Sequence, residues 1–124
     1  MATHPAVDAL QKASKGLEMP SESDAPFEAF LWDTAADKLS HDQVLKLAGA
    51  VGGSSVEEDT LDGLFRTVPS ENKAKFQKLA EAIKQQLSGV KVYKVGDEAE
   101  RDVYIVGRTM NGKWAGLKTS VVET

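Results

Sequence analysis

The residues best suited to bind a metal ion lie at the C-terminal end of the sequence, in Val121-Val122-Glu123-Thr124. Most chain ends fray, but this one directly follows a predicted strand, so we expect it to be held on a rigid element. The Thr124 hydroxyl and the α-carboxylate beside it are hard oxygen ligands of the kind that Mg²⁺ prefers. The end of the chain therefore offers oxygen ligands to a metal ion.

A second polar segment is the acidic loop Ser21-Glu22-Ser23-Asp24, which lies between Pro20 and Pro26. The two prolines stiffen it and the serines and acids keep it exposed. Taken alone, it predicts nothing more than a solvated surface loop.

Other polar groups fit a catalytic or metal site less well. His4 and His41 are the only histidines, and two solvated side chains at helix ends explain them better than a metal or acid–base pair. A solvated turn likewise suits the acids at 97–102 better than Ca²⁺, because their spacing matches no Ca²⁺ loop: Asp97, Glu98, Glu100 and Asp102.

The aromatic residues leave one alternative open. Trp32 is expected in the core. Trp114 follows a tight turn, where it could be a partner-binding residue or pack across the strands against Thr109.

The length of 124 residues predicts one domain, over residues 1–124. The chain has no cysteine, which excludes disulfides and thiolate chemistry. No signal peptide or membrane span is apparent, so we expect a cytoplasmic protein without membrane contact. Lys and Arg total 15 against 19 Asp and Glu, a net charge of −4, which disfavours direct nucleic-acid binding and allows a basic protein partner.

Apolar periodicity predicts helices over about 5–15, after Ser40, after Ser55 and over about 71–87. Ser40 with Gln43 and Ser55 with Glu58 resemble capping boxes, and Ser70 is the expected cap of the long helix. Its apolar stripe is predicted to face the core, and Gly89 is its expected stop: Phe76, Leu79, Ala80, Ile83 and Leu87.

Four strands are predicted, over 27–32, 90–95, 101–108 and 114–122. Asn111-Gly112 predicts a two-residue hairpin turn, which would pair Gly107 with Gly116. Residues 103–106 are apolar on both faces of their strand, so both faces must be covered. We therefore expect an α+β fold, with a roughly four-stranded, mainly antiparallel sheet between helical layers.

Several segments together resemble the nuclease A inhibitor family of bacteria. The similarity is tight over 21–32 and from Lys75 to the end, and loose between 33 and 70. It rests on the order and spacing of these segments: SES and PFEAFLW (21–32), KFQKLAEAIK (75–84), VYKVG (92–96), DVYIVGRT with NG and AG (102–116), and TSVVET (119–124).

The resemblance implies a three-layer α/β/α sandwich similar to the pathogenesis-related class 1 fold. It implies a non-enzymatic inhibitor, monomeric when free, that binds one-to-one to a sugar-nonspecific endonuclease with a ββα-metal active site. Glu22 matches the family's acidic contact, with Ser21, Ser23 and Asp24 around it. Thr124, after Glu123, matches the threonine that reaches the catalytic Mg²⁺ of the nuclease. The inhibitor itself needs no cofactor, since that metal belongs to the partner.

The sequence departs from the family at Arg66–Asn72, where a well-known member has a longer acidic segment with a nuclease-contacting tryptophan. Three explanations are open: a lower affinity, a different partner, or Trp114 in the missing role. Another binding module of this fold, an enzyme, and a nucleic-acid binder are the rival functions. The enzyme lacks a nucleophile–base pair or a metal-ligand set in the sequence.

Overall fold

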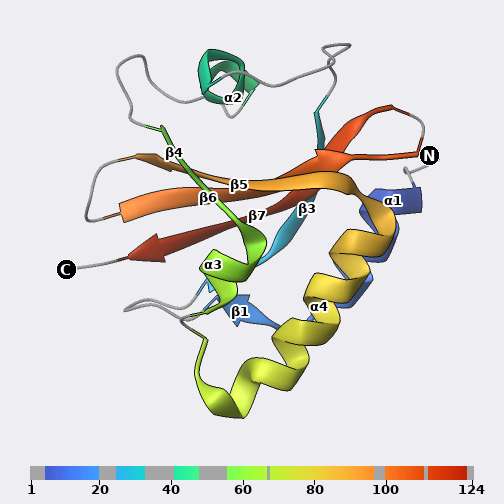
Figure 1. Ribbon diagram of the computed structural model, residues 1–124, viewed down its shortest axis with the longest axis vertical. Coiled ribbons are helices and arrows are strands. Elements are labelled where there is room, and N and C mark those ends of the chain that lie inside the picture. The colour runs from blue at the N-terminus through green and yellow to red at the C-terminus, as the bar shows by residue number, and fades with distance from the viewer. Residues whose placement is uncertain are drawn as a thin grey trace.

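The computed structural model describes residues 5–19, 25–32, 41–47, 56–66, 68–96, 100–110 and 112–122. Helices and strands are interspersed along the chain up to α4, which is followed by three consecutive strands (Figure 1). The helices are α1 (Pro5–Ser14), α2 (His41–Leu47), α3 (Leu61–Phe65), a 3₁₀ turn η1 (Ser70–Asn72) and α4 (Lys73–Gln86). The strands are β1 (Glu18–Met19), β2 (Ala25–Pro26), β3 (Glu28–Trp32), β4 (Val56–Asp59), β5 (Ser88–Gly96), β6 (Glu100–Arg108) and β7 (Trp114–Val122).

Five of the strands form one antiparallel sheet in the order β3-β7-β6-β5-β4. Strands β1 and β2 form a separate antiparallel ladder. The four predicted strands are present as β3, β5, β6 and β7, and β4 is an addition at the edge. The mixed α and β composition and the antiparallel sheet are therefore confirmed; the main sheet has one strand more than expected, and the β1–β2 ladder was not predicted.

Both faces of the sheet are covered by helices. On one face, Val103 and Ile105 belong to a core cluster that includes residues of α1, α3 and α4. On the other face, Tyr104 and Val106 join a second cluster with Val44 of α2. Figure 1 shows α1 and α4 on one side of the sheet and α2 on the other. The alternation of apolar residues in β6 correctly predicted cover on both sides.

The segment after Ser55 is a strand followed by a helix, so the short helix predicted there is present as α3, but its predicted start at Ser55 was wrong. Residues 56–59 pair with β5. Helix α3 begins two residues later than β4 ends, and Thr60 Oγ1 caps it by accepting a hydrogen bond from the Gly63 amide at 3.0 Å. A threonine at the N-cap position accepts a hydrogen bond from a first-turn amide that has no carbonyl partner within the helix.

The ends of the long helix also differ from the prediction. Ser70 does not cap α4; it begins the 3₁₀ turn, and no side chain caps either element. At the other end, the helix stops at Gln86 and Leu87 is already extended. Gly89, at φ +59°, lies inside β5 where the register with β6 shifts. It therefore forms a β-bulge, for which a left-handed glycine is suited.

The β6–β7 hairpin has a longer turn than predicted. The Thr109 amide donates to the Lys113 carbonyl at 2.7 Å, and the Gly112 amide donates to the Thr109 carbonyl at 3.0 Å, with Gly112 at φ +78°. These bonds close a three-residue loop that ends in a left-handed glycine. Gly107 consequently pairs with Ala115 and Gly116 with Val106, so the predicted pairing of the two glycines was wrong by one residue.

Candidate functional site

The acidic segment Ser21, Glu22, Ser23 and Asp24 lies outside the described residues, but the structure shows how its base is held. Met19 pairs with Ala25, and Glu18 pairs with Pro26. Met19 is 2% exposed and is part of the larger core cluster. The β1–β2 ladder thus closes the segment at residues 20–24 and fixes its base to the core.

The last described residues are the C-terminal end of β7. Val121 pairs with Arg101 and Val122 with Glu100, and the Val121 side chain is buried. Strand β7 has β6 on one side and β3 on the other. Glu123 and Thr124 follow directly and lie outside the described residues.

The base of the acidic segment and the end of β7 meet each other. The Thr119 hydroxyl of β7 donates a hydrogen bond to the Ala25 carbonyl at 3.2 Å, and Thr119 is only 4% exposed. This bond joins the residue that closes the acidic segment to a residue five positions before Thr124. Sequence reasoning missed Thr119, because nothing local distinguishes it from any other strand threonine.

Ion pairs line the sheet near the end of β7. Arg101, which pairs with Val121 in the register, places Nη1 2.6 Å from Glu57 Oε2 on β4. Arg101 pairs with Gly96 of β5. Because Gly96 has no side chain, the Arg101 side chain can extend across β5 to reach Glu57. Lys94 Nζ lies 3.5 Å from Asp59 Oδ2. Arg101 thus ties β4 to β6 across the intervening strand.

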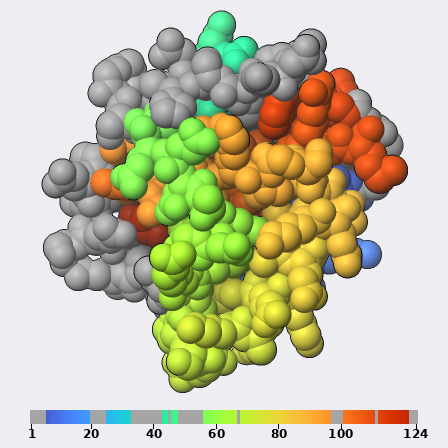
Figure 2. Space-filling view, in the orientation of Figure 1, coloured from blue at the N-terminus to red at the C-terminus, as the bar shows by residue number. Residues whose placement is uncertain are grey.

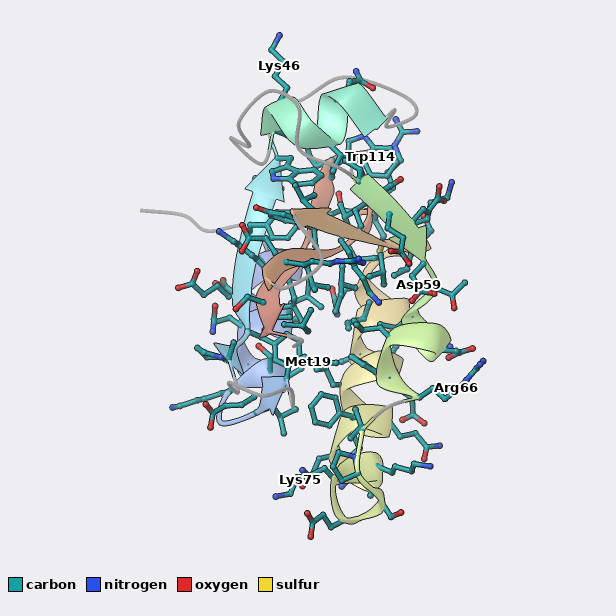
Figure 3. The ribbon with its side chains drawn as sticks, turned by 90° about the vertical axis from the view of Figure 1, so that its left-hand side faces the viewer. Met19, Lys46, Asp59, Arg66, Lys75 and Trp114 are labelled. Carbon is teal, nitrogen blue, oxygen red and sulfur yellow. The ribbon has the colours of Figure 1, made fainter. Side chains whose placement is uncertain are left out.

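Trp114 lies at the opposite end of β7. The strand is nine residues long, which at about 3.3 Å per residue separates its ends by roughly 26 Å. Trp114 pairs with Arg108 and Trp32, is half-buried against the second core cluster, and lies beside α2 in Figure 3. The Arg108 guanidinium carbon is 5.7 Å from its ring centroid, so the cross-strand neighbour is Arg108 and the predicted Thr109 pairing was wrong.

Among the described residues, the groups whose pKa values are shifted are two tyrosines and a lysine on the α2 side of the sheet. Burial raises the pKa of Tyr104 above its ordinary value, and burial likewise raises the pKa of Tyr93. A hydrogen bond from Lys91 to Glu58, together with their charge attraction, raises the pKa of Lys91. These shifts reflect packing and ion pairing rather than a group poised for proton transfer.

The other predicted polar groups are described only in part. His4, the acids at 97 and 98, and the Ser40 cap lie outside the described residues, as do the side chains of His41 and Glu100. Within the described ranges no group of three or more His, Asp or Glu side chains could hold a metal ion. Within the same ranges, no helix is both long and apolar enough to cross a membrane.

A comparison with protein families gives one match. The family described as nuclease A inhibitor-like protein matches residues 4–124, nearly the whole chain. No curated protein shows significant similarity.

Proposed function

Because this chain belongs to the nuclease A inhibitor-like family, we propose that it binds and blocks the active site of a sugar-nonspecific, Mg-dependent endonuclease. The observation that carries the proposal is the family match over residues 4–124. The function is binding, and no residue of this chain acts as a catalyst. The Mg²⁺ involved belongs to the nuclease, and the inhibitor carries no cofactor of its own.

Two residues make the principal contacts in this mechanism. Glu22, flanked by Ser21, Ser23 and Asp24, stands in for a substrate phosphate and pairs with an arginine in the nuclease cleft, a charge-assisted contact. Thr124, next to Glu123, supplies its hydroxyl or carboxylate to the Mg²⁺ of the nuclease, directly or through a water. The nearby negative charge would accelerate encounter with a groove built to bind nucleic acid.

The Thr119–Ala25 hydrogen bond supports a joint role for these two segments. It connects the residue that closes the acidic segment to the strand that leads to Thr124. Both anchors are tied to the sheet or core, through β7 and through buried Met19. Segments held in this way lose less conformational freedom on binding, which increases affinity.

The finer features of the proposal follow from the same family. We expect a three-layer α/β/α sandwich similar to the pathogenesis-related class 1 fold, and helices on both faces of the sheet support it. We also expect a cytoplasmic monomer that forms a one-to-one complex and makes no direct contact with nucleic acid.

The test is inhibition of a sugar-nonspecific endonuclease by the intact protein, by a form lacking Thr124, and by Glu22→Ala. We expect inhibition by the intact protein and a large loss on deleting Thr124. Removing one member of a buried charge pair typically costs about 2–5 kcal/mol, so Glu22→Ala should weaken binding at least severalfold. Inhibition unaffected by either change would leave the inhibitory function standing and exclude this mechanism.

Trp114→Phe serves as the control at the other end of β7. It preserves an aromatic ring against Trp32 and Arg108, so it should leave the inhibition constant unchanged if Trp114 has only a packing role. A weakened constant in the folded variant would assign Trp114 to the interface.

The alternative function is a protein-binding module of the same fold with a non-nuclease partner. The short segment between α3 and α4, a single 3₁₀ turn at Ser70–Asn72, favours it, since it replaces a longer nuclease-contacting segment. A complete absence of inhibition by the intact protein would select this alternative.

A further inference from the structure

A groove lies between α3 and α4, and none of the residues that line it is among the principal contacts proposed above. It has a volume of about 480 Å³. A second hollow of about 380 Å³ continues it toward Gly89 and Val90 of β5. Asp62 and Lys84 line both hollows. In Figure 2 the groove lies where the green surface of α3 meets the yellow surface of α4.

The floor of the groove is apolar. Phe65 and Phe76 meet edge to face, with ring centroids 5.1 Å apart, and Ala80 of α4 lies beside them. Phe76 is only 2% exposed, whereas Phe65 and Ala80 are half-buried. The floor therefore offers a partly exposed apolar strip made by Phe65 and Ala80.

The rim of the groove carries three cations, Arg66, Lys73 and Lys84, and two acids, Asp62 and Glu81. Arg66 and Lys73 flank one end, and both side chains are exposed. Neither makes a salt bridge within the described part of the chain. At the other end Lys84 Nζ lies 3.8 Å from Asp62 Oδ1, with both side chains more than half exposed. An exposed pair of this kind is weak, so Lys84 can exchange Asp62 for a carboxylate of a partner.

The local charge contrasts with that of the whole protein. The chain has a net charge of −4, yet α4 carries lysines at 73, 75, 78 and 84 and Glu81 as its single acid. Of these, Lys73, Lys84 and Glu81 line the groove together with Arg66 and Asp62. A net basic lining beside an apolar floor on an acidic protein is complementary to an acidic segment with an apolar side chain.

We propose that the α3–α4 groove binds an acidic peptide segment of a partner protein, with one apolar side chain on the Phe65–Ala80 floor and carboxylates at Arg66, Lys73 and Lys84. The proposal does not rest on nuclease inhibition, because the groove is formed by α3 and α4 and its occupant is an acidic peptide.

The shape and floor of the groove favour a peptide over other anions. Lys73 and Lys84 are separated by about 16 Å at the helical rise of 1.5 Å per residue, a span that suits several extended residues and exceeds a compact metabolite. Single-stranded nucleic acid would need exposed rings on which bases stack, and Phe76 is buried.

The probe is a fluorescein-labelled peptide with a central leucine flanked by glutamates. It is titrated into the intact protein at about 0.15 M salt, where charges more than about 8 Å apart are screened, and binding is followed by anisotropy. The control peptide has glutamine at every glutamate position. We expect saturable binding of the acidic peptide alone. With ¹⁵N-labelled protein, the amide shifts should be confined to α3 and α4 around Phe65, Gln77 and Ala80.

The decisive variants are Lys73→Glu and Lys75→Glu, which make the same charge change in the first turn of the same helix. Lys73 lines the groove and Lys75 does not; in Figure 3, Lys75 points away from the side that carries Arg66. Lys73→Glu should weaken binding about tenfold, because reversal both removes an attraction and adds a repulsion. Lys75→Glu should change it by less than about twofold, a surface effect screened by salt.

Several results would overturn the proposal. They are equal losses for the two variants, equal binding of the glutamine peptide, no saturable binding, or amide shifts outside α3 and α4. An oligothymidylate that binds with the same dependence on Lys73 would assign the groove to nucleic acid instead. Loss of nuclease inhibition in Lys73→Glu alone would place the occupant in the nuclease. Arg66→Glu repeats the test if Lys73→Glu fails to fold, as judged by thermal melting.

Discussion

The two faces of the central sheet are covered in different ways. The face toward α1, α3 and α4 is mainly aliphatic, and its sheet residues Val92, Val103, Ile105 and Leu117 are all 0% exposed. The face toward α2 is largely aromatic. There Phe30, Trp32 and Tyr104 lie within 6 Å of one another by ring centroid.

Cations take part in covering the α2 face. Lys118 Nζ lies 5.7 Å from the Tyr104 ring centroid, and Arg108 lies at the same distance from Trp114. Long cationic side chains can cover apolar surface while their charged ends stay in water. We infer that the α1/α4 face supplies most of the folding free energy, and that the α2 face tolerates change better and responds more to pH.

The strongest test of this comparison pairs one buried residue from the helix on each face. Ile83 of α4 and Val44 of α2 are both 0% exposed. Ile83→Ala should lower the free energy of unfolding by about 4 kcal/mol, since it removes three carbons and leaves a cavity under α4. Val44→Ala should cost about 1–2 kcal/mol, because it removes less and α2 is a short helix that can settle. Urea denaturation measures both, and an equal or larger cost for Val44→Ala would contradict the comparison.

A smaller difference in stability between the two faces is expected from strand β6. There the same substitution can be made on each face, so that side-chain size does not differ. Val103 faces α1 and α4, Val106 faces α2, and they are 0% and 1% exposed. Val103→Ala should cost about 2 kcal/mol and Val106→Ala about 1 kcal/mol, because the half-buried Phe30 and Trp114 can move into the space left by Val106. Equal costs from denaturant titration would mean that both faces are equally rigid.

Sequence patterns predicted the strands and helices that bury apolar residues. The apolar stripe of α4 predicted the burial of Phe76, Leu79 and Ile83. The apolar residues of β6 predicted that both faces of the sheet are buried, and both predictions are confirmed. The burial of Trp32 was also predicted correctly. These predictions succeeded because the spacing of apolar residues along one helix or strand indicates which of its side chains are buried.

Strand β4 could not be predicted in this way. Its sequence, Val-Glu-Glu-Asp, has one apolar residue, so it shows no alternation. It is held by partners that are distant in sequence: Glu57 by Arg101, Glu58 by Lys91, and Asp59 by Lys94. A strand stabilised by cross-strand charges leaves no local signal.

At the candidate site, too, some features could be predicted from the sequence and others could not. The resemblance singled out Glu22 and Thr124 because they match the family's contact positions, and that assignment stays a prediction. The contact between their anchors depends on Thr119 and Ala25, which are 94 residues apart. The position of Trp114 depended on the register of a hairpin, and one additional turn residue moved its neighbour from Thr109 to Arg108.

The smallest expected effect concerns alkaline pH and belongs to the α2 face. Burial of Tyr93 and Tyr104, which are 3% and 4% exposed, raises their pKa above the ordinary value of 10.0. The folded protein therefore retains these protons at a pH where the unfolded chain releases them. The stabilisation is complete below pH 10 and is lost as pH rises through the folded-state values.

Lys91 adds a contribution of the same sign, because its hydrogen bond to Glu58 raises its pKa above 10.5. The variant Tyr93→Phe/Tyr104→Phe should flatten the fall of melting temperature above pH 10. Glu58→Gln should remove the part due to Lys91 and the smaller part that the Glu58 charge adds at Tyr93. Both should match the parent at pH 8 more closely than Ile83→Ala does. An unchanged alkaline profile in the double variant would mean that the tyrosines ionise as readily in the folded as in the unfolded chain, and the α2 face would then be no more sensitive to pH than the other.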